Sequence, residues 1–378
     1  MKVLSIYGTR PEAIKMAVLS KRLSACDNIE HKVCVTAQHR EMLDQVLSFF
    51  EIVPEFDLNI MKPNQDLTDL TARILQKLRD LFQNDWRPDL VLVHGDTTTC
   101  FAASLAAFYE GIKIGHVEAG LRTGNLQSPF PEEANRSLVG RIANYHFAPT
   151  EKNVNNLLNE GISSDNILKT GNTVIDSLLA TTEKVSDFSK EMDSQELRKA
   201  VKNHEQFILI TGHRRENFGN GFLNICKAIK ELAIKYPNTI FIYPVHLNPK
   251  VLKPVNEILN AINNVLLIKP LQYIDFVYAM KNAYAILTDS GGVQEEAPGL
   301  GKPVLVMRDT TERPEAVEAG TVKLVGANAN NIIDGVSELL NNSDIYTKMS
   351  NAHNPYGDGK SSERIVEFLT NLNVGDSL

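Results

Sequence analysis

The chain has 378 residues, more than one hydrophobic core usually serves, so we expect two domains. Its 39 basic and 46 acidic residues give a net charge of −7, which disfavours nucleic acid as a general partner. The four cysteines lack CxxC or metal-ligand spacing, and the sequence shows no signal peptide and no apolar run near a membrane-spanning length of about 18 residues. We therefore expect a cytoplasmic protein with reduced thiols and no membrane partner.

Strands and helices alternate along the first part of the chain. We predict strands at residues 3–7, 32–36, 90–93, 112–116 and 146–147, and helices at residues 11–23, 41–50, 66–81, 98–109 and 133–143. Such alternation is typical of a parallel sheet covered by helices on both faces.

A second series of the same kind follows a polar, helix-prone stretch at residues 186–206. Its strands are predicted at residues 208–211, 240–243, 265–268, 285–288 and 304–306, and its helices at residues 222–235 and 276–281. We predict an α/β protein of two Rossmann-like, doubly wound domains that face each other across a cleft. The first covers residues 1–170 and is rejoined by a C-terminal helix at 361–372 and the tail to 378; the second covers residues 171–360.

The stretch YAILTDSGGVQEEAPGLGKP (284–303) is the most informative about function. An apolar strand ends in a tight turn at Ser290, Gly291 and Gly292, and a helix is predicted to begin at residue 293. Adjacent glycines let a ligand approach the backbone, and the free N–H groups at a helix start favour an anion. The pattern indicates a phosphate site, with Glu296 placed for ribose hydroxyls; an ordinary strand–turn–helix corner is the alternative.

Polar residues also follow the strands of the first domain, where ligands of doubly wound folds bind. Arg10 and Lys15 follow the first strand, Asp96 and Glu118 follow two later strands, and Glu132 starts the next helix. Converging carboxylates are costly unless they bind cations or perform proton chemistry, so we interpret these three as acid/base candidates. Helix capping and surface charge remain the alternative for each one.

Cationic groups follow the strands of the second domain. His213 and two arginines follow its first strand, and Arg313 follows a later one; such groups can neutralise a leaving diphosphate. Phe276 is a candidate for stacking on a base, although aromatic residues at helical spacing are more often in the core. His246 is compatible with a core or loop position. No GxSxG elbow and no GxxxxGK[ST] P-loop is present.

Ten sequence blocks, in order, closely resemble the non-hydrolysing bacterial UDP-N-acetylglucosamine 2-epimerases, and the resemblance runs from residue 1 to the C-terminal helix. They are GTRPEAIK (8–15), TAQHREMLDQV (36–46), VLVHGDTTT (91–99), GHVEAGLRTG (115–124), PEEANR (131–136), GNTVID (171–176), TGHRREN (211–217), YPVHLNP (243–249), LTDSGGVQEEAPGLGKPVLVMRDTTERPEA (287–316) and NPYGDG (354–359).

The resemblance implies a GT-B fold, a homodimer, and reversible conversion of UDP-GlcNAc to UDP-ManNAc for bacterial surface polysaccharide, with no nicotinamide cofactor and no essential metal. It implies elimination of UDP to a 2-acetamidoglucal, followed by re-addition. It further implies an acid/base set of Asp96, Glu118 and Glu132, with His213 stabilising the diphosphate, and a nucleotide site formed by Arg10, Lys15, Phe276, Ser290, Gly291, Gly292, Glu296 and Arg313.

Members of this family also bind a second UDP-GlcNAc as an activator, and the resemblance suggests Gln38, His39, Gln45, Arg73 and His246 for that site. One position departs from the pattern, because Leu271 stands where some relatives have glutamine after the proline. Three other activities stay open: a GT-B glycosyltransferase using a UDP-sugar donor, a hydrolysing epimerase, and a UDP-sugar sensor without turnover.

Overall fold

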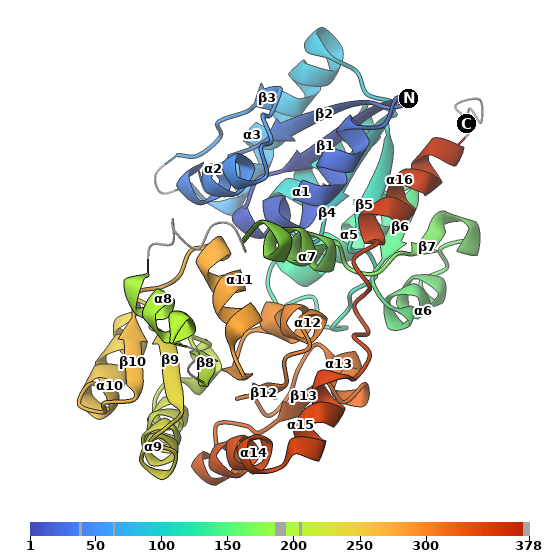
Figure 1. Ribbon diagram of the computed structural model, residues 1–378. Helices are drawn as coiled ribbons and strands as arrows, with labels where there is room; N and C mark the ends of the chain where they lie inside the picture. Colours follow the sequence, from blue (N-terminus) through green and yellow to red (C-terminus); the bar gives the residue numbers. More distant parts are fainter. Residues whose placement is uncertain (38–39, 63–64, 186–193, 204–205, 373–378) are drawn as a thin grey trace. The chain divides into compact units, whose positions relative to one another are not determined.

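The computed structural model describes residues 1–37, 40–62, 65–185, 194–203 and 206–372 (Figure 1). The chain falls into two units, which we call unit 1 and unit 2. Unit 1 comprises Met1–Ser177 and the chain from Tyr356 onward, and unit 2 comprises Leu178–Pro355. The crossings therefore lie at 177–178 and 355–356, against 170–171 and 360–361 in the sequence interpretation.

Unit 1 contains a parallel sheet in the order β3-β2-β1-β4-β5-β6-β7. Its strands are β1 (Lys2–Tyr7), β2 (Glu30–Val35), β3 (Phe56–Asp57), β4 (Leu90–His94), β5 (Lys113–Val117), β6 (Tyr145–Ala148) and β7 (Ile167–Lys169). Its helices are α1 (Arg10–Ser24), α2 (Arg40–Phe49), α3 (Leu67–Asp80), α4 (Thr98–Tyr109), α5 (Glu132–Ile142), α6 (Glu151–Asn159) and α16 (Ser361–Asn371). The strand order reverses between β1 and β4, which makes their carboxyl ends the expected ligand position.

Unit 2 repeats this plan with the parallel order β10-β9-β8-β11-β12-β13. Its strands are β8 (Phe207–Thr211), β9 (Ile240–Pro244), β10 (Val265–Ile268), β11 (Ala285–Thr288), β12 (Val304–Val306) and β13 (Val322–Leu324). Its helices are α8 (Gln195–Lys202), α9 (Asn220–Lys235), α10 (Pro249–Leu259), α11 (Tyr273–Asn282), α12 (Gly291–Gly299), α13 (Pro314–Glu318), α14 (Ala329–Asn341) and α15 (Ser343–Ser350); α7 (Thr173–Val185) spans the first crossing. Here the order reverses between β8 and β11.

Each unit has its own apolar core, built where helices cover the sheet. In unit 1, Leu4, Ile6 and Val91 of the sheet pack with Leu70 and Ile74 of α3, whose buried positions recur at helical spacing. In unit 2, the buried cluster includes Ile208 and Ile210 of β8, Phe222 and Ile229 of α9 and Leu287 of β11. The predicted fold class, α/β with two doubly wound parallel sheets, is confirmed.

The predicted strands and helices are present, with ends displaced by at most three residues. The sequence analysis did not predict β3, β7 and β13, which have two or three residues each and lie at sheet edges. It also did not predict α6, α7, α10, α13, α14 and α15, while α8 lies in the stretch described as helix-prone. Short edge strands carry too few residues for a pattern to emerge.

The C-terminal helix α16 packs on unit 1, beside α1 (Figure 1). Its Phe368 ring contacts the rings of Tyr145 and Phe147 edge-on, with centroids 5.4 and 5.6 Å away. The buried carboxylate of Asp176 accepts hydrogen bonds from the backbone N–H groups of Ser361 and Ser362, at 3.2 and 2.7 Å, and so holds the start of α16. The return of the chain is thus fixed by both an apolar and a polar contact.

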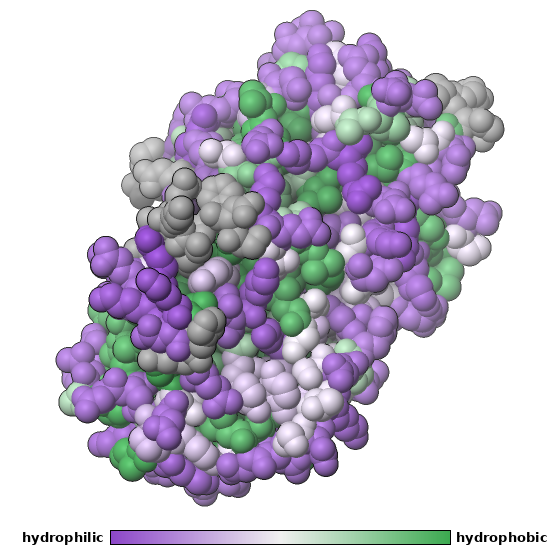
Figure 2. All heavy atoms as spheres, viewed as in Figure 1, coloured by the Kyte–Doolittle hydropathy of each residue, from purple (hydrophilic) through white to green (hydrophobic). Residues whose placement is uncertain are grey.

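The face shown in Figure 2 is mostly hydrophilic, with apolar side chains in small separate groups. Within the described residues, no helix combines the length and apolarity needed to cross a membrane.

Candidate functional site

The carboxyl ends of β4 and β5 bring two predicted carboxylates of unit 1 into one electrostatic cluster. Glu118 directly follows β5 and has a left-handed backbone, with φ +64°, which is uncommon for a residue with a side chain. Its Oε2 atom contacts the Lys15 ammonium, accepts a hydrogen bond from Asn172 Nδ2 at 2.9 Å, and lies 3.6 Å from His94 Nε2. These contacts set the Lys15 ammonium, the His94 ring and the Asn172 amide around one carboxylate oxygen.

The protein shifts the pKa values of these two carboxyl groups in opposite directions. Burial opposes ionisation of Glu118, but the charges of Lys15 and His94 outweigh it and hold the pKa well below its usual range. Burial raises the pKa of Asp96, helped by the negative charge of Glu118 and opposed by Arg136 and Lys15. Glu118 is therefore held as an anion, and Asp96 binds its proton more tightly.

Asp96 is positioned from α5. Arg136, which is almost fully buried, pairs with Asp96 Oδ2 at 2.9 Å and with Glu133 at 3.5 Å. The buried Glu133 in turn accepts the N–H groups of Thr123 and Gly124, both at 2.9 Å. Arg136 and Glu133 thus join the first turn of α5 to the loops after β4 and β5.

Glu132, the third predicted carboxylate, is the first residue of α5 and is half-buried. Arg136 Nε reaches only its backbone oxygen, at 3.3 Å, and no hydrogen bond or ion pair of the Glu132 side chain occurs among the described residues. The structure therefore places Glu132 on the helix that holds Asp96, but it does not join the Glu132 carboxylate to the pair.

The start of α1 holds Arg10 and Lys15, the two predicted cations of unit 1. Arg10 is the first helical residue and is partly exposed. The preceding Thr9 and the following Glu12 form a capping box, and Glu12 Oε2 also accepts the N–H of Gly8 at 3.1 Å. Lys15 is directed to Glu118 instead of to solvent.

In unit 2 the loop after β8 is fastened to the loop after β11 by Asp289, whose side chain is fully buried. Its carboxylate accepts the N–H groups of His213 and Arg214, each at 2.9 Å, and Asn217 Nδ2 at 3.3 Å. The two loops at the point where the strand order reverses are therefore held together by the hydrogen bonds of Asp289.

The predicted phosphate turn is assembled with Arg313. The helix α12 begins at Gly291, two residues earlier than predicted, with Ser290 as its N-cap, and the Ser290 side chain caps no backbone N–H. A Cβ added to Gly291 would lie 3.3 Å from the Arg313 guanidinium, and one added to Gly292 would lie 3.9 Å from Glu296 Oε1. The guanidinium is oriented by Glu295, which accepts from Arg313 Nε at 2.7 Å. The helix start, Arg313 and Glu296 are thus neighbours, as a phosphate and ribose site requires.

These observations can be set beside known proteins. A family model described as UDP-N-acetylglucosamine 2-epimerase matches residues 21–370. UDP-N-acetylglucosamine 2-epimerases from Yersinia pestis and from Escherichia coli K12 are each 57% identical, over 99% of this chain and 100% of theirs. A crystal structure of the UDP-GlcNAc 2-epimerase from Neisseria meningitidis, bound to UDP-GlcNAc, matches with a TM-score of 0.89 at 56% identity, covering 98% of this chain and 100% of that one.

The chain belongs to the UDP-N-acetylglucosamine 2-epimerase family. The predicted resemblance and the predicted enzyme, a UDP-N-acetylglucosamine 2-epimerase, are confirmed. The predicted GT-B fold is likewise that of the matched epimerase structure.

His213 of this family member stacks on His246, with ring centroids 5.3 Å apart and planes at 14°. Burial lowers the pKa of His213, and His246 and Arg214 add to that effect, while Asp289 opposes it. Burial therefore favours the neutral ring, and an anion bound beside His213 would favour the charged one.

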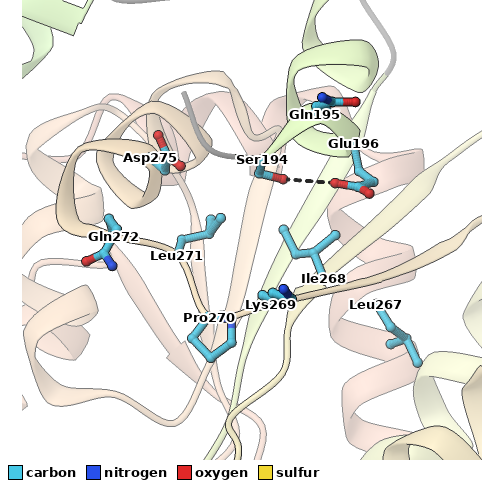
Figure 3. Close-up of a pocket in the computed structure, with 10 residues that line it drawn as sticks. All are labelled: Ser194, Gln195, Glu196, Leu267, Ile268, Lys269, Pro270, Leu271, Gln272 and Asp275. Carbon is cyan, nitrogen blue, oxygen red and sulfur yellow. Dashed lines mark hydrogen bonds between the residues drawn. The ribbon is translucent and has the colours of Figure 1, made fainter. Parts of the chain in front are cut away.

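Leu271, where the sequence departs from some relatives, lines a pocket of about 700 Å³ in unit 2 (Figure 3). The pocket lies between the end of β10, the start of α11 and the start of α8, and its lining residues are Ser194, Gln195, Glu196, Leu267, Ile268, Lys269, Pro270, Leu271, Gln272 and Asp275. Phe276, the predicted base-stacking residue, is half-buried on α11 next to Asp275 but is not part of that lining.

The suggested activator residues are divided between the two units. Gln38 and His39 lie outside the described residues. Gln45 is exposed on α2, whereas Arg73 on α3 donates to Ile60 O at 3.0 Å and to Gln65 Oε1 at 3.1 Å. His246 belongs to unit 2, where it stacks on His213.

Sequence reasoning did not identify the residues that hold the site residues in place: Asn172, His94, Arg136, Glu133 and Asp289. All five are almost fully buried polar groups inside the quoted blocks. Position in those blocks was the available signal, but only tertiary contacts show which partner each one holds. Among the described residues, no group of three or more His, Cys, Asp or Glu side chains is arranged to hold a metal ion.

Proposed function

We propose that the chain interconverts UDP-GlcNAc and UDP-ManNAc by elimination and re-addition of UDP. In the first half, a carboxylate takes the C2 proton, the C1–O bond breaks with its electrons leaving on UDP, and a C1–C2 double bond forms. In the second half, UDP adds back to C1 while C2 receives a proton on its opposite face. The C2 proton is not next to a carbonyl, so departure of UDP must accompany its removal.

The opposite pKa displacements of Glu118 and Asp96 carry this proposal. Epimerisation needs a base on one face of C2 and an acid on the other, and neighbouring groups with pKa values pushed apart supply both. Lys15, His94 and Asn172 keep Glu118 ionised, so we assign it as the base in the direction from UDP-GlcNAc. Asp96, whose pKa is raised by burial, is the corresponding acid, and Glu132 completes the set as the family resemblance implies.

Unit 2 supplies the groups that stabilise the departing diphosphate. The uncapped start of α12, the Arg313 guanidinium and the His213 ring are suited to an anion with two phosphate groups. We assign Ser290, Gly291, Gly292 and Arg313 to the diphosphate, Glu296 to ribose and Phe276 to uracil; Arg10 and Lys15 remain further candidates for the nucleotide. A backbone contact at Leu271 would not depend on its side chain.

Proton NMR of UDP-GlcNAc in D2O with the protein, and without any acceptor, tests the proposal. We expect UDP-ManNAc to appear while deuterium replaces the C2 proton in both sugars. Free ManNAc together with UDP would indicate a hydrolysing enzyme, and a requirement for an acceptor sugar would indicate a glycosyltransferase. Binding without conversion would indicate a sensor.

We further infer a cytoplasmic homodimer that supplies ManNAc units for bacterial surface polysaccharide and that is activated by a second UDP-GlcNAc. The family resemblance supports all of these points, and the four free cysteines suit a reducing compartment. Light scattering of the purified chain tests the dimer, and the dependence of initial rate on UDP-GlcNAc in the direction from UDP-ManNAc tests the activation.

A further inference from the structure

The carboxylate of Glu118 is held by one oxygen only. Lys15, Asn172 and His94 all converge on Oε2, and among the described residues no hydrogen bond is made to Oε1. The Oε1 atom is directed towards Gly95, where an added Cβ would lie 3.9 Å away, and Gly95 precedes Asp96. The Glu118 side chain is largely buried, with 12% of its surface exposed. The arrangement distinguishes an anchored oxygen from one without such contacts.

The amide of Asn172 is fixed in the orientation that this anchoring needs. Asn172 Oδ1 accepts the N–H of Val174 at 3.1 Å, in the first turn of α7, while Nδ2 donates to Glu118 at 2.9 Å. Exchanging the two amide atoms would place an NH₂ group against an N–H and an oxygen against a carboxylate. Both faces of the amide therefore select the same orientation, and the residue is 2% exposed.

The backbone of Asn172 is held as firmly as its side chain. Its N–H donates to Tyr356 O at 2.6 Å, where the chain re-enters unit 1. Gly171, at φ +88°, permits this approach, because a Cβ there would lie 2.7 Å from Ser361 Oγ. Further along the same segment, Ser177 Oγ donates to Ile14 O at 2.5 Å, in the turn of α1 that carries Lys15. One segment, residues 171–177, thus contacts Glu118 directly and the backbone of α1 next to Lys15.

We propose that Asn172 is a positioning residue for Glu118: its amide and Lys15 together fix Oε2, so that Oε1 is the oxygen that takes the substrate proton. The role of Glu118 as a base rests on the proposed function, whereas the anchoring by Asn172 does not. Lys15 provides charge, but an ammonium on a flexible stem does not set a direction, and the planar amide does. The other charged or titratable groups that interact with Glu118 are His94 from β4, Asp96 after it and Cys100 of α4.

Two substitutions separate this role from helix capping. Asn172→Ser keeps a side chain that caps helices well but is too short to reach Glu118. Asn172→Asp keeps the acceptor for Val174 and places a second carboxylate oxygen where Nδ2 donated, so it should disfavour the ionised form of Glu118 more strongly. Asn156→Ser is the matched control, because Asn156 Nδ2 donates over the same 2.9 Å to Gly120 O, in the same loop, without touching Glu118.

Carbon NMR titration of the Glu118 carboxyl, assigned by its loss in Glu118→Gln, gives the first readout and needs no substrate. We expect the Glu118 pKa to rise in Asn172→Ser, to rise further in Asn172→Asp, and to stay unchanged in Asn156→Ser. In epimerisation assays the acidic limb of kcat/KM should move to higher pH in the same order. At optimal pH, kcat should fall roughly tenfold to a hundredfold, with a smaller change in KM.

The proposal is overturned if the Glu118 titration in both Asn172 variants coincides with that of the wild-type protein. It is also overturned if Asn156→Ser shifts the titration as much as Asn172→Ser. Should Asn172→Ser fail to fold, Asn172→Asp carries the test alone. A wild-type chain that lacks epimerase activity refutes the proposed function, while the titration still decides whether Asn172 anchors Glu118.

Discussion

Each unit has a helix that starts beside the reversal of its strand order, and these two helices begin in opposite ways. In unit 1, α1 follows β1 and its start is closed by the chain itself, through the capping box of Thr9 and Glu12. In unit 2, α12 follows β11 and its N-cap, Ser290, caps no N–H, while a guanidinium lies directly over Gly291. Both helices start beside the point where the strand order of their sheet reverses. One helix start beside a strand-order reversal is therefore closed by its own side chains in unit 1, and another is left available for an anion in unit 2.

The difference extends to how each unit treats its charges. Unit 1 buries its carboxylates among cations, as with Lys15 beside Glu118 and Arg136 beside Asp96. Unit 2 places the Arg313 guanidinium, oriented by Glu295, beside the start of α12, and its Asp289 carboxylate organises backbone N–H groups as Glu133 does in unit 1. Proton chemistry needs carboxylates with displaced pKa values, whereas nucleotide binding needs oriented donors. We therefore expect the carboxylates of unit 1 to carry the proton chemistry and the oriented donors of unit 2 to bind the nucleotide.

The largest expected effect concerns acid stability, in which the units should differ. Burial lowers the pKa of His116 to about 3 and that of His146 to about 4, so unit 1 buries two neutral rings that an unfolded chain would protonate. A depressed pKa gives stability that is present above the unfolded value, about 6.5, and is lost as pH falls toward the folded value. Each unit of displacement is worth about 1.4 kcal/mol, so unit 1 should lose stability as the pH falls from about 6 towards 3.

Unit 2 should lose less stability in this range. Its His213 also has a lowered pKa, but Arg308 holds the pKa of Glu312 at about 2, against the effect of burial, and the stability from that pair is lost only below about pH 4.5. Fluorescence of Trp86, the single tryptophan and a buried residue of unit 1, reports the first transition, and hydrogen exchange in β8 and β11 reports the second. The variant His116→Gln should move the Trp86 transition to lower pH. Coincident transitions in both units would contradict the comparison.

The next largest effect concerns the carboxylates of unit 1. We expect Asp96→Asn, Glu118→Gln and Glu132→Gln each to lower kcat by roughly 10²–10⁴-fold with smaller changes in KM, since each removes a proton donor or acceptor. Glu151→Gln, which loses only an exposed pair with Lys169, is the control and should retain wild-type rates. A variant that keeps near wild-type kcat identifies a carboxylate that does not move the proton.

The unit 2 counterpart is a loss of binding. Arg313→Ala should weaken the binding of UDP roughly tenfold to a hundredfold, because hydrogen bonds to charged groups are worth about 1.5–3 kcal/mol. His213→Asn should instead retain measurable UDP affinity while losing most C1–O cleavage, seen as slower release of 2-acetamidoglucal. Titration calorimetry with UDP measures the first effect. The control is Lys323→Ala, which removes only the exposed ion pair of Lys323 on β13 with Glu338. If His213→Asn releases the glucal as fast as the wild-type protein, the cation that assists cleavage lies elsewhere.

Much of this comparison was accessible from the sequence, because strand and helix periodicities are long-range patterns and the strand ends are where ligands bind. The strand-end positions of Asp96, Glu118, His213 and the Ser290 turn were predicted in this way. The capping box at Thr9 and the anchoring of Glu118 by Asn172 were not, since Asn172 is 54 residues from Glu118 and nothing local pairs them. Sequence patterns locate reactive groups, but the tertiary partners that orient those groups and shift their pKa values require coordinates.

The smallest expected effect tests the two helix starts directly. Thr9→Ala removes a side-chain cap and should cost about 1 kcal/mol of unfolding free energy, a decrease in Tm of about 2–4 °C for a unit of this size. Ser290→Ala removes no capping bond, so its Tm should stay close to that of the wild-type protein, while its affinity for UDP falls. Calorimetric melting measures the first property and UDP titration the second. Both residues occupy the N-cap of a helix that follows a central strand. Equal losses of stability would mean that Ser290 caps α12 as Thr9 caps α1, and the anion site would then have to lie elsewhere in unit 2.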